Sequence, residues 1–319
     1  MPTVPFFTNL APETAALLTQ YAPADFAVTV YPSTMPDGEK LPIVAAADFL
    51  ILFPGYLSEP VLRAAHHVKL IQLVSVGFDR MDLKLCRELG IPVANNGGTN
   101  ALDVTEHTIA LILAFYRRLV EMNSNVRTNQ WNVIDSGATT YCINGKTVGI
   151  VGFGQIGQRV ARLVGAFGAR ILYYDPYPPA PSVAHELKAQ RVSLEELFKQ
   201  ADIVTLHMPL NDSTRGLVNE RLLALMKPTA LLVNTCRGPV IDEPALTTAL
   251  SEQRIAGAAL DVLEQEPPDP ANPLLQLENV IFTPHTAGVT RDTWPRRGKF
   301  IFENLQRVWN GEAPLAAIL

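Results

Sequence analysis

Short apolar segments alternate with helical segments along the whole chain. In the first third, continuous apolar runs predict strands at residues 4–7, 26–30, 49–53, 70–75 and 92–94. Helices are expected between them, for example at residues 12–21, 58–65 and 80–89. Because the strands are apolar at consecutive positions, both of their faces are expected to be covered, which favours a parallel sheet between layers of helices.

A second series of apolar runs begins after residue 146. It predicts strands at residues 148–151, 171–174, 203–207, 230–234, 258–261 and 280–283. Two mononucleotide-binding halves require six strands joined by helical crossovers, which is the number predicted here.

The two series are expected to form two domains. A helix at residues 101–118 is apolar nearly all round, which is typical of a helix buried between domains or subunits. The last helix, at residues 291–309, is too short to form a domain and is expected to pack back on the first series. We therefore predict an α/β chain with parallel sheets, in which a domain of residues 100–285 is inserted into a discontinuous domain of residues 1–99 plus 286–319.

Length, charge and cysteine content narrow the class of protein. The 319 residues exceed what one hydrophobic core usually serves, which agrees with two domains. The formal net charge is −5 without a block of like charges, so neither nucleic acid nor a membrane is an expected partner. No signal peptide or membrane span is predicted. Cys86, Cys142 and Cys236 are widely spaced, which indicates no disulfide framework and no metal site and favours the reducing cytoplasm.

A glycine-rich fingerprint lies near the middle of the chain, between a predicted strand and a predicted helix. Its sequence is Gly152-Phe153-Gly154-Gln155-Ile156-Gly157. In a dinucleotide site the first glycine allows a tight turn, the second lets a pyrophosphate approach the backbone, and the third lets the helix pack closely on the strand. The free N–H groups at the start of the helix would bind the phosphates. A lone Gly-x-Gly-x-x-Gly also occurs as a purely structural turn.

Asp175, at the end of the next predicted strand, strengthens the case for a dinucleotide. A carboxylate at this place accepts hydrogen bonds from the ribose hydroxyls and repels a 2′-phosphate, which favours NAD over NADP. The alternative is that Asp175 caps the turn before Pro176.

Arg237, Glu266 and His285 each follow a predicted strand of the second series. Ligands of an open α/β sheet bind outside the carboxyl ends of the strands, so the three side chains are expected to converge. Together they suit hydride transfer to a carbonyl. An arginine polarises the oxygen, a histidine gives or takes the proton, and a carboxylate beside the histidine raises its pKa. Taken singly, each residue has an alternative as a surface, loop or turn residue.

Motifs spread over nearly the whole chain resemble those of the D-isomer-specific 2-hydroxyacid dehydrogenase family. The fingerprint is one of them, and the others are Gly77-Phe-Asp-Arg-Met-Asp82, Gly97-Gly-Thr-Asn-Ala101, Glu106-His107, Leu206-His-Met-Pro-Leu210, Met226-Lys-Pro228, Asn234-Thr-Cys-Arg-Gly238, Asp261-Val262 and Thr283-Pro-His285. The resemblance implies two Rossmann-like domains, with an NAD-binding Rossmann domain inserted into a flavodoxin-like substrate domain.

The resemblance also assigns site residues. It implies that Arg237, Glu266 and His285 are catalytic, and it prefers Glu266 to Glu264 because the family's glutamate stands directly before a proline. A substrate carboxylate is expected on a loop matching Val76 and Gly77, with Asn100 nearby. Contacts with NAD are expected from Gly152, Gly154, Gln155, Ile156, Gly157, Asp175, His207, Met208, Pro209, Thr235, Cys236, Asp261 and Gly288.

The implied function is an NAD-dependent D-2-hydroxyacid dehydrogenase. Hydride would pass reversibly between NADH and a small 2-keto acid such as glyoxylate or hydroxypyruvate, with His285 as proton donor and acceptor. Formate- and phosphite-type dehydrogenases of the same superfamily are alternatives, and Glu266 and the uncharged Val76 argue against them. A non-catalytic, NAD-sensing corepressor-like protein is a further alternative.

Two residues, Cys236 and Trp294, leave questions open. Cys236 stands where a small alanine or serine is more common, and it could be a packing residue or, if Arg237 lowered its pKa, a reactive thiol. Trp294 could line the substrate site or belong to the core.

As in the family, a homodimer through the nucleotide domain is expected, involving the helix at 101–115 and an arm at 120–142.

Overall fold

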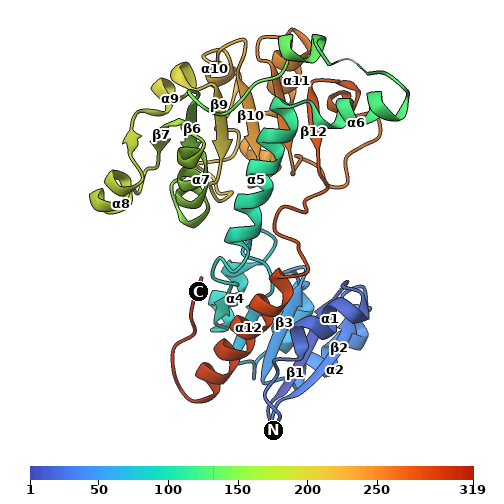
Figure 1. The fold of residues 1–319 in the computed structure, drawn as a ribbon. Coiled ribbons are helices and arrows are strands. Elements are labelled where there is room, and N and C mark those ends of the chain that lie inside the picture. The colour runs from blue at the N-terminus through green and yellow to red at the C-terminus, as the bar shows by residue number, and fades with distance from the viewer. Residues whose placement is uncertain (132) are drawn as a thin grey trace. The chain divides into compact units, whose positions relative to one another are not determined.

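The computed structural model describes residues 1–131 and 133–319, which divide into two compact units (Figure 1). One unit comprises Met1–Asn100 and Val289–Leu319, and the other comprises Ala101–Gly288. The first unit is thus assembled from both ends of the chain, and the second is one continuous segment. The binding roles that the sequence assigned to the two domains stay predictions. None of the helices in the described residues is long and apolar enough to cross a membrane.

The first unit is a parallel sheet with helices. Its elements are β1 (Thr3–Thr8), α1 (Pro12–Thr19), β2 (Ala27–Pro32), α2 (Asp37–Ala45), β3 (Phe49–Phe53), α3 (Glu59–Ala64), β4 (Leu70–Leu73), α4 (Leu83–Leu89), β5 (Val93–Ala94) and α12 (Thr293–Trp309). The strand order is β2-β1-β3-β4-β5 and every pairing is parallel. This is the flavodoxin-like order, as predicted.

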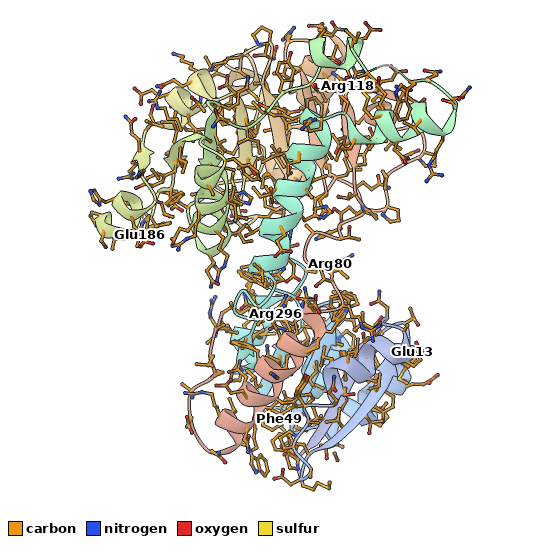
Figure 2. The ribbon with its side chains drawn as sticks, in the orientation of Figure 1. Glu13, Phe49, Arg80, Arg118, Glu186 and Arg296 are labelled. Atoms are coloured by element: carbon orange, nitrogen blue, oxygen red, sulfur yellow. The ribbon has the colours of Figure 1, made fainter. Side chains whose placement is uncertain are left out.

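The final helix, α12, completes the core of the first unit. Its Ile301, Phe302 and Leu305 are at most 2% exposed and cluster with residues of β1 and β3 such as Phe6 and Phe49. Figure 2 labels Phe49 in this unit. After α12 the chain returns to the edge strand β5, where Ala317 forms an antiparallel bridge with Ala94.

The second unit is a wider parallel sheet. Its elements are α5 (Ala101–Tyr116), α6 (Leu119–Arg127), η1 (Asp135–Ala138), β6 (Thr147–Val151), α7 (Gln155–Ala166), β7 (Arg170–Tyr174), α8 (Pro181–Glu186), β8 (Ala189–Arg191), α9 (Leu194–Gln200), β9 (Ile203–Leu206), α10 (Glu220–Leu223), β10 (Leu231–Asn234), η2 (Gly238–Val240), α11 (Glu243–Ser251), β11 (Gly257–Leu260), η3 (Pro273–Gln276) and β12 (Val280–Phe282). The strand order is β12-β11-β10-β9-β6-β7-β8, which contains the doubly wound dinucleotide-binding order.

One strand of this sheet lies outside the prediction. The short edge strand β8 reads Ala-Gln-Arg, and it lacks the apolar run by which the other strands were recognised. The apolar helix α5 packs on the sheet, because Ile109 and Ile112 cluster with Val148 of β6 and Val160 of α7.

A segment with little buried surface connects α5 to β6. Arg118, labelled in Figure 2, turns the chain between α5 and α6 with a φ of 49°. The helix α6 buries none of its residues. The predicted arm at residues 120–142 falls in this segment, except for residue 132, which lies outside the described residues.

Candidate active site

The carboxyl ends of the strands in the second unit carry most of the predicted site residues. Asp175 follows β7, His207 follows β9, Asp261 follows β11, and the fingerprint follows β6. All of these strands are parallel, so their carboxyl ends meet at one edge of the sheet. The chain changes direction across the sheet between β6 and β9, and such a switch point is where open α/β sheets bind ligands.

The three fingerprint glycines differ in their surroundings. Gly152 has a φ of 90°, and a Cβ there would lie 2.5 Å from the carbonyl oxygen of His207. A Cβ at Gly157 would collide with the carbonyl oxygen of Gly152, so the start of α7 lies directly against the turn. By contrast, a Cβ at Gly154 would meet nothing within 4 Å. The backbone at Gly154 is therefore open to a ligand at the N-terminus of α7.

Asp175 is held beside this turn by two backbone groups. Its carboxylate accepts a hydrogen bond of 2.6 Å from the N–H of Phe153 and one of 2.7 Å from the N–H of Tyr177. The second bond is the turn cap that the sequence offered as an alternative. The first bond ties the carboxylate to the fingerprint itself, which fixes a negative charge next to the open backbone.

His285 and Glu266 form a direct pair. The Nδ1 atom of His285 lies 2.7 Å from Oε2 of Glu266, and the other carboxylate oxygen accepts a hydrogen bond of 3.2 Å from the N–H of Leu263. The two side chains are 46% and 39% exposed, so the imidazole is accessible. Burial raises the pKa of Glu266, whereas the hydrogen bond and the charge of His285 lower it. The lowering effects are together the stronger, so the pKa of Glu266 lies below the ordinary 4.5. Glu266 is therefore an ionised partner for the imidazole. The carboxylate that contacts His285 belongs to Glu266, and the rival Glu264 donates its backbone N–H to Glu243.

Arg237 lies in a turn that the side chain of Asn234 stabilises by hydrogen bonds. The buried Asn234 amide donates to the carbonyl of Arg237 at 2.9 Å, and its oxygen accepts from the N–H of Cys236 at 3.0 Å. The turn lies against the loop after β11, because a Cβ at Gly238 would collide with the carbonyl of Leu263. The positive charge of Arg237 is among the influences that lower the pKa of Glu266. The loop that carries Arg237 and the loop that carries Glu266 are thus adjacent.

Cys236 is a packing residue in this arrangement. Its thiol donates to Asn234 at 3.1 Å, and burial raises its pKa to about 11 despite the neighbouring Arg237. Next to it, the nearly buried Thr235 bonds the hydroxyl of Thr108 at 3.1 Å.

The other predicted cofactor residues lie around the same edge. Burial lowers the pKa of His207 to about 3, so its ring is neutral, with Nε2 on the hydroxyl of Thr205 at 2.9 Å. Met208 is 8% exposed. The remaining members are the exposed Gln155 and Pro209 and the partly exposed Ile156 and Gly288.

Asp261 lies beneath the loop that bears His285. Its buried carboxylate accepts hydrogen bonds from the hydroxyl of Thr283 at 2.6 Å and from the N–H groups of Thr286 at 2.9 Å and Ala287 at 3.0 Å. The hydroxyl of Thr283 also contacts Nε2 of His107 on α5, at 2.9 Å. Sequence reasoning missed Thr283 and His107 as site residues, although both belong to motifs that this chain shares with the family it resembles.

The predicted substrate residues Val76, Gly77 and Asn100 belong to the first unit. The amide of Asn95 donates to the carbonyl of Val76 at 2.8 Å, and the hydroxyl of Ser75 donates to the carbonyl of Gly77 at 2.6 Å. Because these carbonyls already accept hydrogen bonds from Asn95 and Ser75, the backbone N–H groups of Val76 and Gly77 are what the loop can offer to a ligand.

Trp294, also in the first unit, is 5% exposed and packs edge to face on Phe53 at 6.0 Å. It is a core residue of that unit.

Comparison with known proteins gives one consistent family. Residues 109–287 match the model of the NAD binding domain of D-isomer specific 2-hydroxyacid dehydrogenases. A glyoxylate reductase of Korarchaeum cryptofilum is 39% identical over 294 residues, which cover 91% of this chain and 88% of that protein. Among solved structures, D-lactate dehydrogenase from Escherichia coli superposes with a TM-score of 0.84 at 29% identity, over 99% of this chain and 100% of that one. An acyclic imino acid reductase in complex with NADPH and D-Arg has the same TM-score at 27% identity and the same coverage of both chains.

Proposed function

Because the chain belongs to the D-isomer specific 2-hydroxyacid dehydrogenase family and is an oxidoreductase acting on CH–OH groups, we propose that it interconverts a small 2-keto acid and its D-2-hydroxy acid with NADH and NAD. In this proposal His285 donates and accepts the proton, Glu266 orients it, and Arg237 binds the substrate. The observation that carries the assignment is the 2.7 Å contact between His285 and Glu266 at the carboxyl edge of a dinucleotide-binding sheet.

The residues present fit a nicotinamide dinucleotide. The open backbone at Gly154 and the N-terminus of α7 suit the pyrophosphate, and Asp175 suits the adenosine ribose. When bound, the reduced cofactor supplies the hydride. Thr235, Met208 and Asp261, with the other predicted cofactor residues at this edge, would hold the rest of the molecule.

The side chains divide the remaining chemistry. Arg237 carries a permanent charge that can grip a carboxylate and polarise a carbonyl oxygen. His285 presents an accessible ring whose Nδ1 is taken by Glu266, so Nε2 is the atom that exchanges a proton with the substrate oxygen. The ionised Glu266 stabilises the imidazolium that must form when an alcohol is oxidised. Binding of the substrate carboxylate by the N–H groups of Val76 and Gly77, near Asn100, is part of the proposal.

We take small acids such as glyoxylate and hydroxypyruvate as the substrates, because the 39% identical relative is named a glyoxylate reductase. The decisive experiment measures NADH oxidation with glyoxylate, hydroxypyruvate, pyruvate and phenylpyruvate, and NAD reduction with formate and phosphite. His285→Ala should lose most turnover while it still binds NADH, as followed by fluorescence titration. Full turnover in this variant, or activity with formate or phosphite alone, would reject the assignment.

The preference for NAD over NADP rests on Asp175. One structural relative was solved with NADPH, so the preference needs its own test. Arg191 donates to the carbonyl of Asp175 at 3.2 Å, so a cation stands close by. Asp175→Ser should therefore lower the KM for NADPH and raise that for NADH, measured with one keto acid. Wild-type protein that used both cofactors equally would refute the preference.

The assembly and location complete the proposal. A homodimer through the second unit is supported by the exposed apolar residues of α6 and the segment that follows it. A cytoplasmic location is supported by the three cysteines, which are all free thiols. Cell fractionation tests the location.

A further inference from the structure

The backbone of His285 adopts an unusual conformation. Its φ is 55°, in the left-handed region that residues with a side chain rarely occupy. Its N–H donates to the carbonyl of Asp261 at 2.7 Å and to that of Thr283 at 3.1 Å. A conformation of this kind persists only when surrounding contacts hold it, and it is often found at functional sites.

The contacts that hold it converge on the Asp261 carboxylate. The group is buried, and it accepts hydrogen bonds from residues on both sides of His285, namely Thr283 before it and Thr286 and Ala287 after it. Movement of the carboxylate or of the Thr283 hydroxyl would therefore displace the histidine backbone.

The proton of the Thr283 hydroxyl can be assigned by counting donors and acceptors. A hydroxyl has one proton, and an ionised carboxylate only accepts, so at 2.6 Å the proton points to Asp261. The hydroxyl oxygen must then accept from Nε2 of His107 at 2.9 Å, so Nε2 carries a proton. The same Nε2 lies 3.5 Å from Oδ1 of Asp261, where its N–H adds to the stabilisation of the negative charge.

We propose that His107 is a positioning residue for His285, acting through Thr283 and the Asp261 carboxylate. The proposal rests on the proposed function and deepens it. His107 lies on α5, and the loop that bears His285 follows β12. The contact between His107 and Thr283 therefore links this loop to the helix α5, which packs on the sheet of the second unit. Without the N–H of His107, the Thr283 hydroxyl can turn away from Asp261, and the loop loses a link on the side that precedes His285.

The test compares two substitutions at this position. His107→Phe keeps a ring but has no donor, whereas His107→Gln places an amide N–H close to where Nε2 stood. An exposed histidine on α8 provides the matched control, His185→Phe. Hydrogen–deuterium exchange of the Thr286 and Ala287 amides reads out the loop independently of activity. Exchange should be about tenfold faster in His107→Phe and near the wild-type rate in His107→Gln and His185→Phe.

Kinetics then connect the loop to catalysis. With a keto acid that the wild type reduces, kcat of His107→Phe should fall about 10- to 100-fold, because small displacements of a proton donor are costly. The KM for NADH should change little, and His107→Gln should recover most of kcat. Amide exchange unchanged in His107→Phe, or an equal loss of kcat in both variants, would overturn the proposal. If the wild type reduces no keto acid, the proposed function fails, and the exchange measurement still decides the role of His107.

Discussion

The thiol of Cys236 lies beside a permanent positive charge and is nevertheless held in its neutral form. Proximity to Arg237 lowers its pKa, but burial acts more strongly in the opposite direction, and the pKa is raised to about 11. At the pH of a cell the group is a small apolar side chain with a weak donor. Its environment, and not its neighbour in sequence, decides its chemistry.

A labelling experiment separates Cys236 from the exposed thiol of Cys142. Iodoacetamide at pH 7.5 should modify the exposed Cys142 and leave Cys236 unmodified, because only the thiolate reacts. Peptide mass spectrometry locates the adducts, and NADH oxidation measured on the same sample should be unchanged. Rapid labelling of Cys236 with loss of activity would contradict this expectation.

The lowered pKa of Glu266 predicts how catalysis should depend on pH. Since its pKa is lowered, the carboxylate stays ionised above about pH 4.5, and its support of the His285 imidazolium is lost only as the pH falls through the lowered value. Glu266→Gln removes that support at every pH. Its kcat for keto acid reduction should fall about 100-fold, and the alkaline limb of its kcat/KM profile should move to lower pH. An unshifted limb in Glu266→Gln would show that the carboxylate does not stabilise the imidazolium, and Glu264→Gln is the matched control.

The proposed catalytic residues could be singled out from the sequence because each lies in the loop that follows a strand. Arg237, Glu266 and His285 were expected to converge on that ground alone, and the structure brings Glu266 to His285. The contacts of Asp261 could not be foreseen, because they join residues 107, 261 and 283, which only the packing of α5 against the sheet brings together. The left-handed backbone of His285 likewise has no signal in the sequence.

At the scale of elements, the turn from β6 into α7 is organised by close approach. Gly157 lies against the carbonyl of Gly152, while Gly154 faces open space. The same motif therefore contains one glycine that close packing requires and one whose backbone is open.

Alanine substitutions should separate these two requirements. Gly157→Ala should lower the free energy of unfolding by about 1–3 kcal/mol, because its Cβ overpacks the turn. Gly154→Ala should leave that free energy within about 0.5 kcal/mol of wild type and weaken NADH binding about tenfold or more. Chemical denaturation and fluorescence titration measure the two effects. Equal loss of stability in both variants would show that Gly154 also serves packing.

Strands that carry apolar runs were predicted closely, and β3 was predicted with the bounds that it has in the structure, Phe49–Phe53. The run at 70–75 ends earlier, at Leu73, because the chain turns there into the loop held by Asn95 and Asn96. The strand β8 escaped prediction because an edge position needs little apolar surface. A run of apolar residues thus indicates burial, and it predicts a strand only where that strand is buried.

At the scale of the whole molecule, the segment after α5 exposes an unusual amount of apolar surface. The exposed fractions are 65% for Val120, 76% for Trp131 and 89% for Ile134. Large apolar side chains exposed together are typical of surfaces that bind another protein.

The double substitution Trp131→Glu and Ile134→Glu should convert the proposed dimer into a monomer, because it places charges in an apolar interface. Light scattering coupled to size-exclusion chromatography measures the mass. The paired control is Tyr177→Glu, which alters another exposed aromatic residue outside this segment. A wild-type protein that elutes as a monomer would reject the dimer, and a double variant that stays dimeric would place the interface elsewhere.

The division of the chain also sets an order of events during synthesis on the ribosome. All residues of the second unit, Ala101–Gly288, emerge before the first unit has received α12. Until then the sheet of β1 to β5 lacks Ile301, Phe302 and Leu305, which fill one side of its core. The N-terminal third must therefore wait, with an apolar face uncovered, until α12 has been made. A free chain truncated after Asp292 should hold a folded second unit and a protease-sensitive first unit.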